Sequence, residues 1–399
     1  MNLLITLEHR FDRTPDGAVW TQTGFSHVFW QRYLAVFDHV RVLARVREVH
    51  TVPPDWRRAD GDGVSFVPVP CYVGPWQYLR RWRAVRAAVR GALRIDEAVI
   101  MRIGSNLAAI LAPALRRSGH PYGVEVVGDP YDTFAPGAVR HPLRPLFRWL
   151  FTRRQRRLCV HACAASYVTS QALQRRYPVA PDALSVACSD VELRPEAFVP
   201  SHRRWAQPPD PARLVLVGSL AQMYKAPDVL LQAVARCCAQ GLSVTLAILG
   251  DGKHRRELEA LASTLGLSDA VQFLGQVSAG AAVRQQLDRA DLFVMPSRTE
   301  GLPRAMIEAM ARGLPCIGST VGGIPELLPP EDLVPPGDAI ALADRIAAVL
   351  RDPARMTAMS QRNLAKAREY ADAVLHERRV AFYEQVRRRT EAWLRSRDA

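Results

Sequence analysis

The residues best placed to do chemistry lie in one short segment, where a buried apolar run is followed by a polar loop and a helix. Residues 291–296 predict a strand, and residues 303–312 predict a helix that Pro303 begins and Gly313 ends. The first amides of a helix have no acceptor within the helix and lie at the positive end of its dipole. The turn at Leu302–Arg304 therefore suits a diphosphate.

Two glutamates flank that helix N-terminus. Glu308 lies about 7 Å along the helix at 1.5 Å per residue, roughly the distance from a diphosphate to a ribose. A carboxylate there can accept hydrogen bonds from the ribose hydroxyls. Glu300 precedes the helix and could contact a sugar on the other side of the phosphate. For either glutamate alone, an exposed helix residue or a plain N-terminal charge is the simpler interpretation, whereas the two together favour ligand binding.

The elements that must position these residues alternate between short apolar strands and longer amphipathic helices. This pattern predicts doubly wound α/β layers, in which ligands bind at the carboxyl ends of the strands. The predicted strands are 3–7, 40–46, 98–103, 122–127 and 164–169 in the first half and 214–218, 245–249, 271–274, 292–295 and 316–317 in the second.

The length of 399 residues predicts two domains. A proline-rich, weakly periodic stretch at 192–212 predicts a linker between them. We therefore expect a first domain over 1–200 and a second over 210–372.

The composition is that of an ordinary globular protein, with 48% hydrophobic and 23% charged residues, which excludes a disordered or collagen-like chain. The net charge is +14, and residues 1–205 hold 29 basic and 17 acidic residues, a net +12. Such asymmetry suggests an anionic partner for the first half. The seven cysteines form no C-x-x-C pair and are expected to be reduced, as in a cytoplasmic protein. In the first ten residues, charged side chains follow an apolar run that is too short for a signal peptide.

The segment 297–310, Ser-Arg-Thr-Glu-Gly-Leu-Pro-Arg-Ala-Met-Ile-Glu-Ala-Met, resembles the E-x7-E motif of retaining GT-B glycosyltransferases. The resemblance is to the glycosyltransferase group 1, or GT4-type, family. It is strong over about 212–350 and rests on architecture alone before that. Further segments resemble elements of the family's donor domain, in the family's order: Val217–Leu220 with Lys225–Asp228, Leu249–Gly252, Phe273–Val277 and Gly322–Glu326.

The resemblance implies two Rossmann-like domains facing an interdomain cleft, with a C-terminal helix of about 373–399 packing back on the first domain. It implies that Lys225 holds the donor diphosphate, that Glu308 binds the ribose and that Glu300 contacts the transferred sugar. The implied donor-binding set is Gly218, Ser219, Lys225, Gly250, Gln276, Val277, Glu300, Gly301, Leu302, Pro303, Arg304 and Glu308.

The sequence departs from the family pattern at two places. Where the family often has an arginine after the glycine of its first donor-domain strand, this chain has Ser219, so one phosphate-neutralising charge is missing or comes from elsewhere. Where many members have a histidine facing the sugar, this chain has Asp129 before Pro130. We take Asp129 as the third candidate catalytic residue, beside Glu300 and Lys225. A plain turn residue is an equally good interpretation of Asp129.

The family resemblance implies retention of configuration, with the donor phosphate acting as the base for the acceptor hydroxyl. No protein nucleophile, cofactor or metal is then expected. Asp60-Gly61-Asp62 is the D-x-D motif of the chain, and it is interpreted as a solvated turn. We expect a UDP-sugar as donor first and a GDP-sugar second. The expected acceptor is a sugar or a lipid-linked sugar of surface polysaccharide or glycolipid synthesis.

Basic residues and aromatic residues alternate in the segments 76–90 and 140–157. Two interpretations stay open, contact with the anionic inner face of the cell membrane and a solvated helix face on which arginine stems pack. The arginines that would contact the membrane are Arg80, Arg81, Arg83, Arg144, Arg148, Arg153 and Arg154.

Two other function classes remain as alternatives to a transferase. A nucleotide-sugar epimerase of the same architecture would break the same bond without transfer. A basic, non-enzymatic protein that binds nucleic acid or membranes would fit the charge, but the sequence has no recognised nucleic-acid module and leaves Glu300 and Glu308 without a purpose. We therefore expect no nucleic-acid partner.

Overall fold

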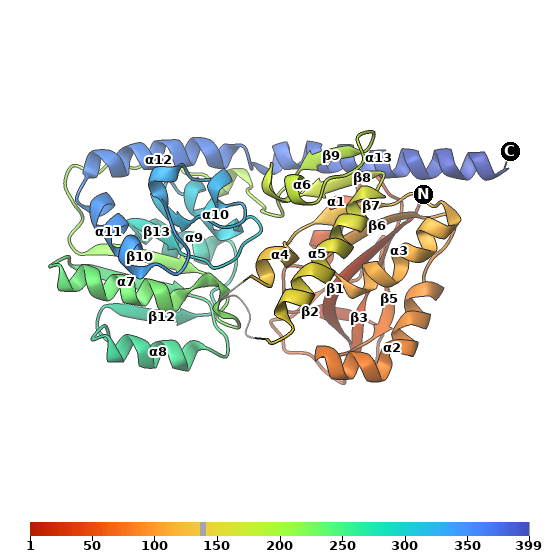
Figure 1. Cartoon of the computed structure of the whole chain (residues 1–399), viewed down its shortest axis with the longest axis horizontal. Coiled ribbons are helices and arrows are strands. Elements are labelled where there is room, and N and C mark those ends of the chain that lie inside the picture. The colour runs from red at the N-terminus through yellow and green to blue at the C-terminus, as the bar shows by residue number, and fades with distance from the viewer. Residues whose placement is uncertain (136–140, 399) are drawn as a thin grey trace. The chain divides into compact units, whose positions relative to one another are not determined.

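The structure is a computed structural model that describes residues 1–135 and 141–398 (Figure 1). The chain divides into two compact units. Unit 1 comprises Met1–Pro130, Trp149–Cys188 and His376–Ala399, and unit 2 comprises Tyr131–Arg148 and Ser189–Leu375. Arg140, in the second basic segment of the sequence, lies outside the described residues.

Unit 1 is built on a parallel sheet in the order β5-β3-β1-β6-β7-β8-β9. Two short antiparallel strands extend it: β2 (Val19–Thr21) pairs with the far end of β1, and β4 (Arg57–Arg58) pairs with β2. The parallel strands are β1 (Leu3–Arg13), β3 (Val40–Glu48), β5 (Val64–Pro70), β6 (Ala98–Ile103), β7 (Gly123–Val126), β8 (Ala164–Tyr167) and β9 (Leu184–Ala187). The helices of this part of the chain are α1 (His27–Leu34), α2 (Gly74–Gly91), α3 (Asn106–Ser118), α4 (Pro130–Thr133), α5 (Arg144–Val160) and α6 (Ala172–Arg176).

The last helix, α13 (Asp372–Asp398), contributes to the core of unit 1. Its buried side chains Phe382, Tyr383 and Val386 belong to the same apolar cluster as the strands β1 and β3. A Cβ atom at Gly123 would lie 2.5 Å from a methyl group of Val386, so the helix can approach β7 this closely because residue 123 is glycine.

Unit 2 is built on a second parallel sheet, in the order β12-β11-β10-β13-β14-β15. Its strands are β10 (Ala212–Val217), β11 (Val244–Leu249), β12 (Val271–Gly275), β13 (Leu292–Met295), β14 (Cys316–Ser319) and β15 (Leu333–Val334). Its helices are α7 (Pro227–Ala239), α8 (Arg255–Thr264), α9 (Ala281–Arg289), α10 (Arg304–Ala311), α11 (Ala339–Leu350) and α12 (Pro353–Arg368).

The strand order of unit 2 contains a topological switch point between β10 and β13. From β10 the chain adds β11 and β12 on one side, and it then returns to place β13 on the other side. The loops that follow β10 and β13 therefore diverge, and open α/β sheets bind their ligands at such places. These two loops carry Lys225 and Glu300.

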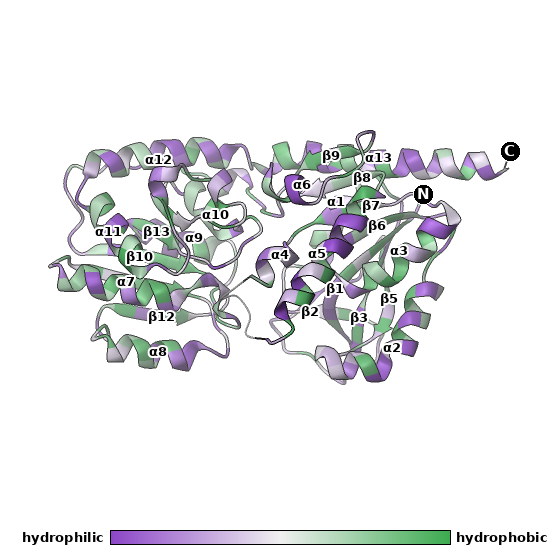
Figure 2. Ribbon diagram, in the orientation of Figure 1, coloured by the Kyte–Doolittle hydropathy of each residue, from purple (hydrophilic) through white to green (hydrophobic). Residues whose placement is uncertain are grey.

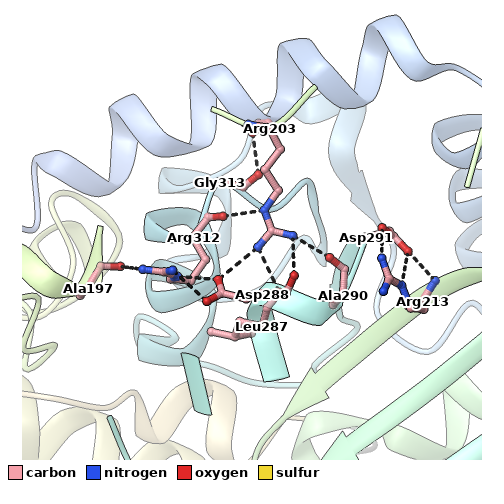
Figure 3. Close-up of polar contacts among 10 residues, drawn as sticks. Ala197, Arg203, Arg213, Leu287, Asp288, Ala290, Asp291, Arg312 and Gly313 are labelled. Carbon is pink, nitrogen blue, oxygen red and sulfur yellow. Dashed lines mark hydrogen bonds and ion pairs between the residues drawn. The ribbon is translucent and has the colours of Figure 1, made fainter. Parts of the chain in front are cut away.

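The proline-rich stretch expected as a linker is anchored on unit 2. Arg203 places its guanidinium against the last turns of two helices and donates to the carbonyls of Leu287, Ala290 and Arg312 at 2.7–3.1 Å (Figure 3). Its backbone amide donates to Ser360 Oγ at 2.8 Å. Since helix ends carry unpaired carbonyls, Arg203 fixes the C-terminal ends of α9 and α10.

Hydropathy follows the layers of each unit. Figure 2 shows the strands of both sheets mostly in the hydrophobic colour, whereas helices such as α2 and α13 alternate between the two colours. None of the described helices combines the length and the apolar character that crossing a lipid bilayer requires.

Candidate active site

The loops after β10 and β13 bring two predicted site residues into direct contact. Lys225 Nζ donates to Glu300 Oε1 at 2.5 Å, and Ser297 Oγ donates to the same oxygen at 2.8 Å. Both charged side chains are largely removed from solvent, with 12% of Lys225 and 8% of Glu300 exposed. The ammonium and the carboxylate therefore neutralise each other at the switch point, and the carboxylate is held in one orientation.

A second ion pair ties the same two loops together. Arg298 forms a bidentate pair with Asp228, at 2.9 Å and 2.6 Å, and it also donates to the carbonyl of Met223 at 2.8 Å. The backbone amide of Arg298 donates to the carbonyl of Tyr224 at 2.7 Å. A planar guanidinium that bonds two segments in this way restricts their relative position. Arg298 was not among the predicted site residues, because its partners follow a different strand.

Close backbone packing explains the predicted site residue Gly250 and its neighbour Gly252. A Cβ atom at Gly250 would lie 2.0 Å from the carbonyl oxygen of Gly218, and one at Gly252 would lie 2.1 Å from the amide of Ala221. Both glycines have positive φ angles, +135° and +159°. Residues without a side chain are thus needed for the loops after β10 and β11 to touch. Ser219, in this contact, is exposed, and its Oγ accepts from the amide of Ala221 at 3.2 Å.

The N-terminus of α10 offers free backbone donors. Its N-cap residue is Pro303, whose side chain makes no capping hydrogen bond. The amides of Arg304 and Ala305 have no backbone acceptor in the described part of the chain. The loop before it, Gly301–Pro303, rests on the next loop, because Gly323 donates to the carbonyl of Gly301 at 2.6 Å. A Cβ atom at Gly322 would lie 2.0 Å from the carbonyl oxygen of Glu300, so this support requires glycine.

Glu308 is a half-buried carboxylate on α10. Among residues 1–135 and 141–398, its side chain has no hydrogen-bond or ion-pair partner. Burial raises the pKa of Glu308, and the nearby charges of Arg304 and Arg284 oppose that rise. An unpaired carboxylate in this position is available to accept hydrogen bonds from a ligand.

The predicted base-binding residues lie at the edge of the same sheet. Gln276 and Val277 directly follow β12, and the loop that holds Gly250 reaches this turn, since Gly250 donates to the carbonyl of Gly275 at 2.8 Å. Arg255 supports the strand end by donating to the carbonyl of Phe273 at 3.0 Å. The structure thus brings the predicted donor-binding residues to the carboxyl edge of one sheet.

Asp129 lies in unit 1, after β7, and its carboxylate binds side chains of the same unit. Its carboxylate forms an ion pair with Arg176 and accepts a hydrogen bond from the hydroxyl of Tyr177 at 2.5 Å. A contact between Asp129 and the transferred sugar remains a prediction. Asp60 has a local role, because it accepts from the amide of Val19 at 2.9 Å and pairs with Arg58.

Comparison with known proteins relates the chain to a family of glycosyltransferases. Residues 200–367 match the family model described as glycosyl transferases group 1. Protein CapJ of Staphylococcus aureus is 26% identical over 328 residues, which cover 81% of this chain and 80% of CapJ. The putative colanic acid biosynthesis glycosyltransferase WcaL of Salmonella typhimurium is 36% identical over 134 residues, 32% of each chain.

Solved structures with the same fold cover nearly the whole chain. Sucrose-phosphate synthase from Thermosynechococcus elongatus has a TM-score of 0.71 at 19% identity, over 97% of this chain and 99% of that one. WaaG, a glycosyltransferase involved in lipopolysaccharide biosynthesis, has a TM-score of 0.63 at 16% identity, over 94% and 97%. The prediction of a doubly wound, two-domain α/β fold is confirmed. Residues 200–367 thus match the group 1 glycosyltransferase family, and the two Rossmann-like units have the GT-B fold.

Proposed function

We propose that the protein is a retaining glycosyltransferase that moves a sugar from a nucleotide-diphosphate sugar to a saccharide or lipid-linked acceptor. One observation carries this proposal, the Lys225–Glu300 contact beside the open N-terminus of α10. The unpaired Glu308 lies on the same helix. A cation, free amides and two carboxylates are the groups that a diphosphate between a ribose and a sugar requires.

The residues suggest how transfer would proceed. Lys225 and the α10 amides stabilise the negative charge on the departing diphosphate as the bond from the sugar C1 to the phosphate oxygen breaks. The acceptor oxygen forms its bond to C1 on the same face, and its proton passes to the leaving phosphate. Glu300, oriented by Lys225 and Ser297, contacts the transferred sugar. We propose that this chemistry needs no protein nucleophile and no metal.

The printed names of similar proteins support the choice of substrates. HepE from Anabaena, which shares the fold, has been solved with UDP and glucose, which favours a UDP-sugar before a GDP-sugar. Relatives named for colanic acid and amylovoran biosynthesis support an acceptor in surface polysaccharide synthesis. A glycolipid acceptor would agree with the membrane contact proposed below.

A thermal-shift screen of UDP-, GDP- and ADP-sugars tests the donor class. A donor at a hundred times its Kd should stabilise the protein by about 2.7 kcal/mol, and one nucleotide series should raise Tm more than the others. With that donor, nucleotide diphosphate should be released faster when an acceptor is added. No shift with any donor would contradict the proposal, and a change of the donor sugar without an acceptor would favour the epimerase.

We further propose that α2 contacts the anionic inner face of the cell membrane. Trp76, Leu79 and Trp82, spaced by three residues along the helix, are 77%, 59% and 40% exposed. Five arginines and no acidic residue accompany them on α2. Exposed aromatic side chains beside cations suit the headgroup layer of an anionic bilayer. The arginines are Arg80, Arg81, Arg83, Arg86 and Arg90.

The helix α5 supports this contact less well. It exposes Trp149 and Leu150, but Arg148 stacks on the Tyr131 ring at 3.5 Å. Arg154 donates to the backbone carbonyl of Asn106 at 3.3 Å. Two of the arginines that α5 was expected to present to the membrane are therefore engaged within the protein, as is Arg81 of α2, which donates to the carbonyl of Cys71.

Cosedimentation with vesicles of phosphatidylglycerol tests the membrane contact. The protein should bind at low salt and be released at high salt, and Arg80→Glu with Arg83→Glu should weaken binding at least about tenfold, at about 1 kcal/mol per arginine. The matched control, Arg144→Glu with Arg153→Glu on α5, should bind nearly as well as the natural protein. Absence of binding at low salt would remove the idea.

A further inference from the structure

The cations around the proposed diphosphate position are mostly neutralised by the protein itself. Lys225 is paired with Glu300 at 2.5 Å, and Arg298 with Asp228 at 2.6 Å. A diphosphate diester carries a negative charge on each phosphate, and the helix dipole supplies only about half a positive charge. Since Ser219 adds no charge, the paired groups leave the bound diphosphate without full compensation.

Arg304 is an unpaired cation at this place. It is the first residue of α10, its side chain is exposed, and it has no hydrogen-bond or ion-pair partner among the residues that the structure describes. It lies four residues before Glu308, so both side chains project from the same face of the helix. Burial raises the pKa values of Glu308 and Tyr224, and the charge of Arg304 lowers both, so its guanidinium lies near each of them.

We infer that the side chain of Arg304 binds the donor diphosphate and supplies the cation that is absent at Ser219. The inference rests on the proposed function and deepens it. Arg304 brings both a free backbone amide at the helix N-terminus and a guanidinium with no competing carboxylate in contact. A guanidinium can donate two parallel hydrogen bonds to a phosphate, which the short hydroxyl of Ser219 cannot replace.

Two other cations of unit 2, which have no hydrogen-bond or ion-pair partner among the described residues, provide controls. Lys253 is exposed and follows β11, on the other side of the β10 loop from α10. Arg284 lies on α9, and its charge acts on Glu308. Neither residue contributes an amide to the helix N-terminus that faces the phosphate position. Charge alone would make all three equivalent, whereas the geometry favours Arg304.

The test compares the affinity of variants for the nucleoside diphosphate that the natural protein binds and for the corresponding nucleoside. Arg304→Ala should weaken nucleoside diphosphate binding by about tenfold to a hundredfold, the effect of one charge-assisted contact, and leave nucleoside binding unchanged. Arg304→Lys should lose less, and Lys253→Ala and Arg284→Ala should lose little. Adding Ser219→Arg to Arg304→Ala should restore part of the affinity.

Several outcomes would overturn the inference. Equal diphosphate affinity of Arg304→Ala and the natural protein would do so, as would an equal loss of nucleoside binding or a larger loss in Arg284→Ala. Because Arg304 is exposed and makes no hydrogen bond or ion pair in the described part of the chain, an unchanged Tm is expected and shows that a loss is not due to unfolding. Failure of the natural protein to bind any nucleoside diphosphate would instead contradict the proposed function.

Discussion

Lys225→Ala should lower kcat by about two to three orders of magnitude, the usual effect of removing one preorganised donor to developing charge, and change the donor KM much less. In the proposed site the ammonium faces the leaving diphosphate, whose charge grows as the bond to the sugar breaks. It also holds Glu300, so both groups lose their arrangement together. Steady-state rates of nucleotide diphosphate release at varied donor concentration measure the effect.

Two control variants make this result specific. Lys253→Ala removes an exposed lysine near the same sheet edge and should leave kcat within about twofold, as expected for a surface substitution. Lys225→Arg retains the charge opposite the largely buried Glu300, and it should keep more activity and a normal Tm. If Lys225→Ala turned over the donor at the natural rate, the role given to the ammonium would be wrong.

Glu308→Gln should raise the donor KM by about tenfold to a hundredfold and change kcat less, because a hydrogen bond to a charged acceptor contributes about 1.5–3 kcal/mol. The carboxylate can accept from neighbouring ribose hydroxyls, whereas the amide offers one oxygen and a donor. The same rate measurements separate the two constants. A fall in kcat at constant KM would place Glu308 in the chemical step instead of in ribose binding.

Glu308→Gln should make the folded protein more stable, although it weakens donor binding. Burial raises the pKa of Glu308 in the folded state, so the protein binds the proton more tightly folded than unfolded. The ionised carboxylate therefore costs stability as the pH rises through the folded-state pKa. Glu308→Gln should have a higher Tm than the natural protein near neutral pH, and the difference should shrink on acidification. Thermal unfolding between about pH 4 and pH 8 measures this.

Donor affinity should follow the same titration. If the charged carboxylate binds the ribose, the natural protein loses affinity as the pH falls through the raised pKa of Glu308. The glutamine variant lacks this group, so its weaker affinity should depend less on pH. A variant that is neither more stable at neutral pH nor weaker in donor binding would mean that Glu308 is an ordinary surface residue.

The donor half of the site was predictable from the sequence because its signals are local. The apolar run before Pro296 and the Pro303–Gly313 punctuation predict β13 and α10 to within a few residues. Backbone amides at a helix N-terminus need no particular side chain, so the helix start alone locates them. That Lys225 and Glu300, 75 positions apart in the chain, belong to one site came from the family resemblance, and their direct contact was not predicted.

Contacts between distant segments were not predictable. The partners of Arg298 and Arg203 follow other strands or end other helices, and no pattern in the sequence links them. The strand β5 was not predicted, because it contains Pro68 and Pro70 and proline within an apolar run argues against a strand. The ion pair of Asp129 with Arg176 joins residues that follow β7 and β8, which only the folded sheet brings together.

A crystal structure of the protein with its preferred nucleoside diphosphate tests the central claim most directly. We expect the phosphates within hydrogen-bond distance of Lys225 Nζ and the amides of Arg304 and Ala305, with the ribose hydroxyls on Glu308. A nucleotide bound away from the N-terminus of α10, or one whose phosphates do not approach Lys225, would contradict the account.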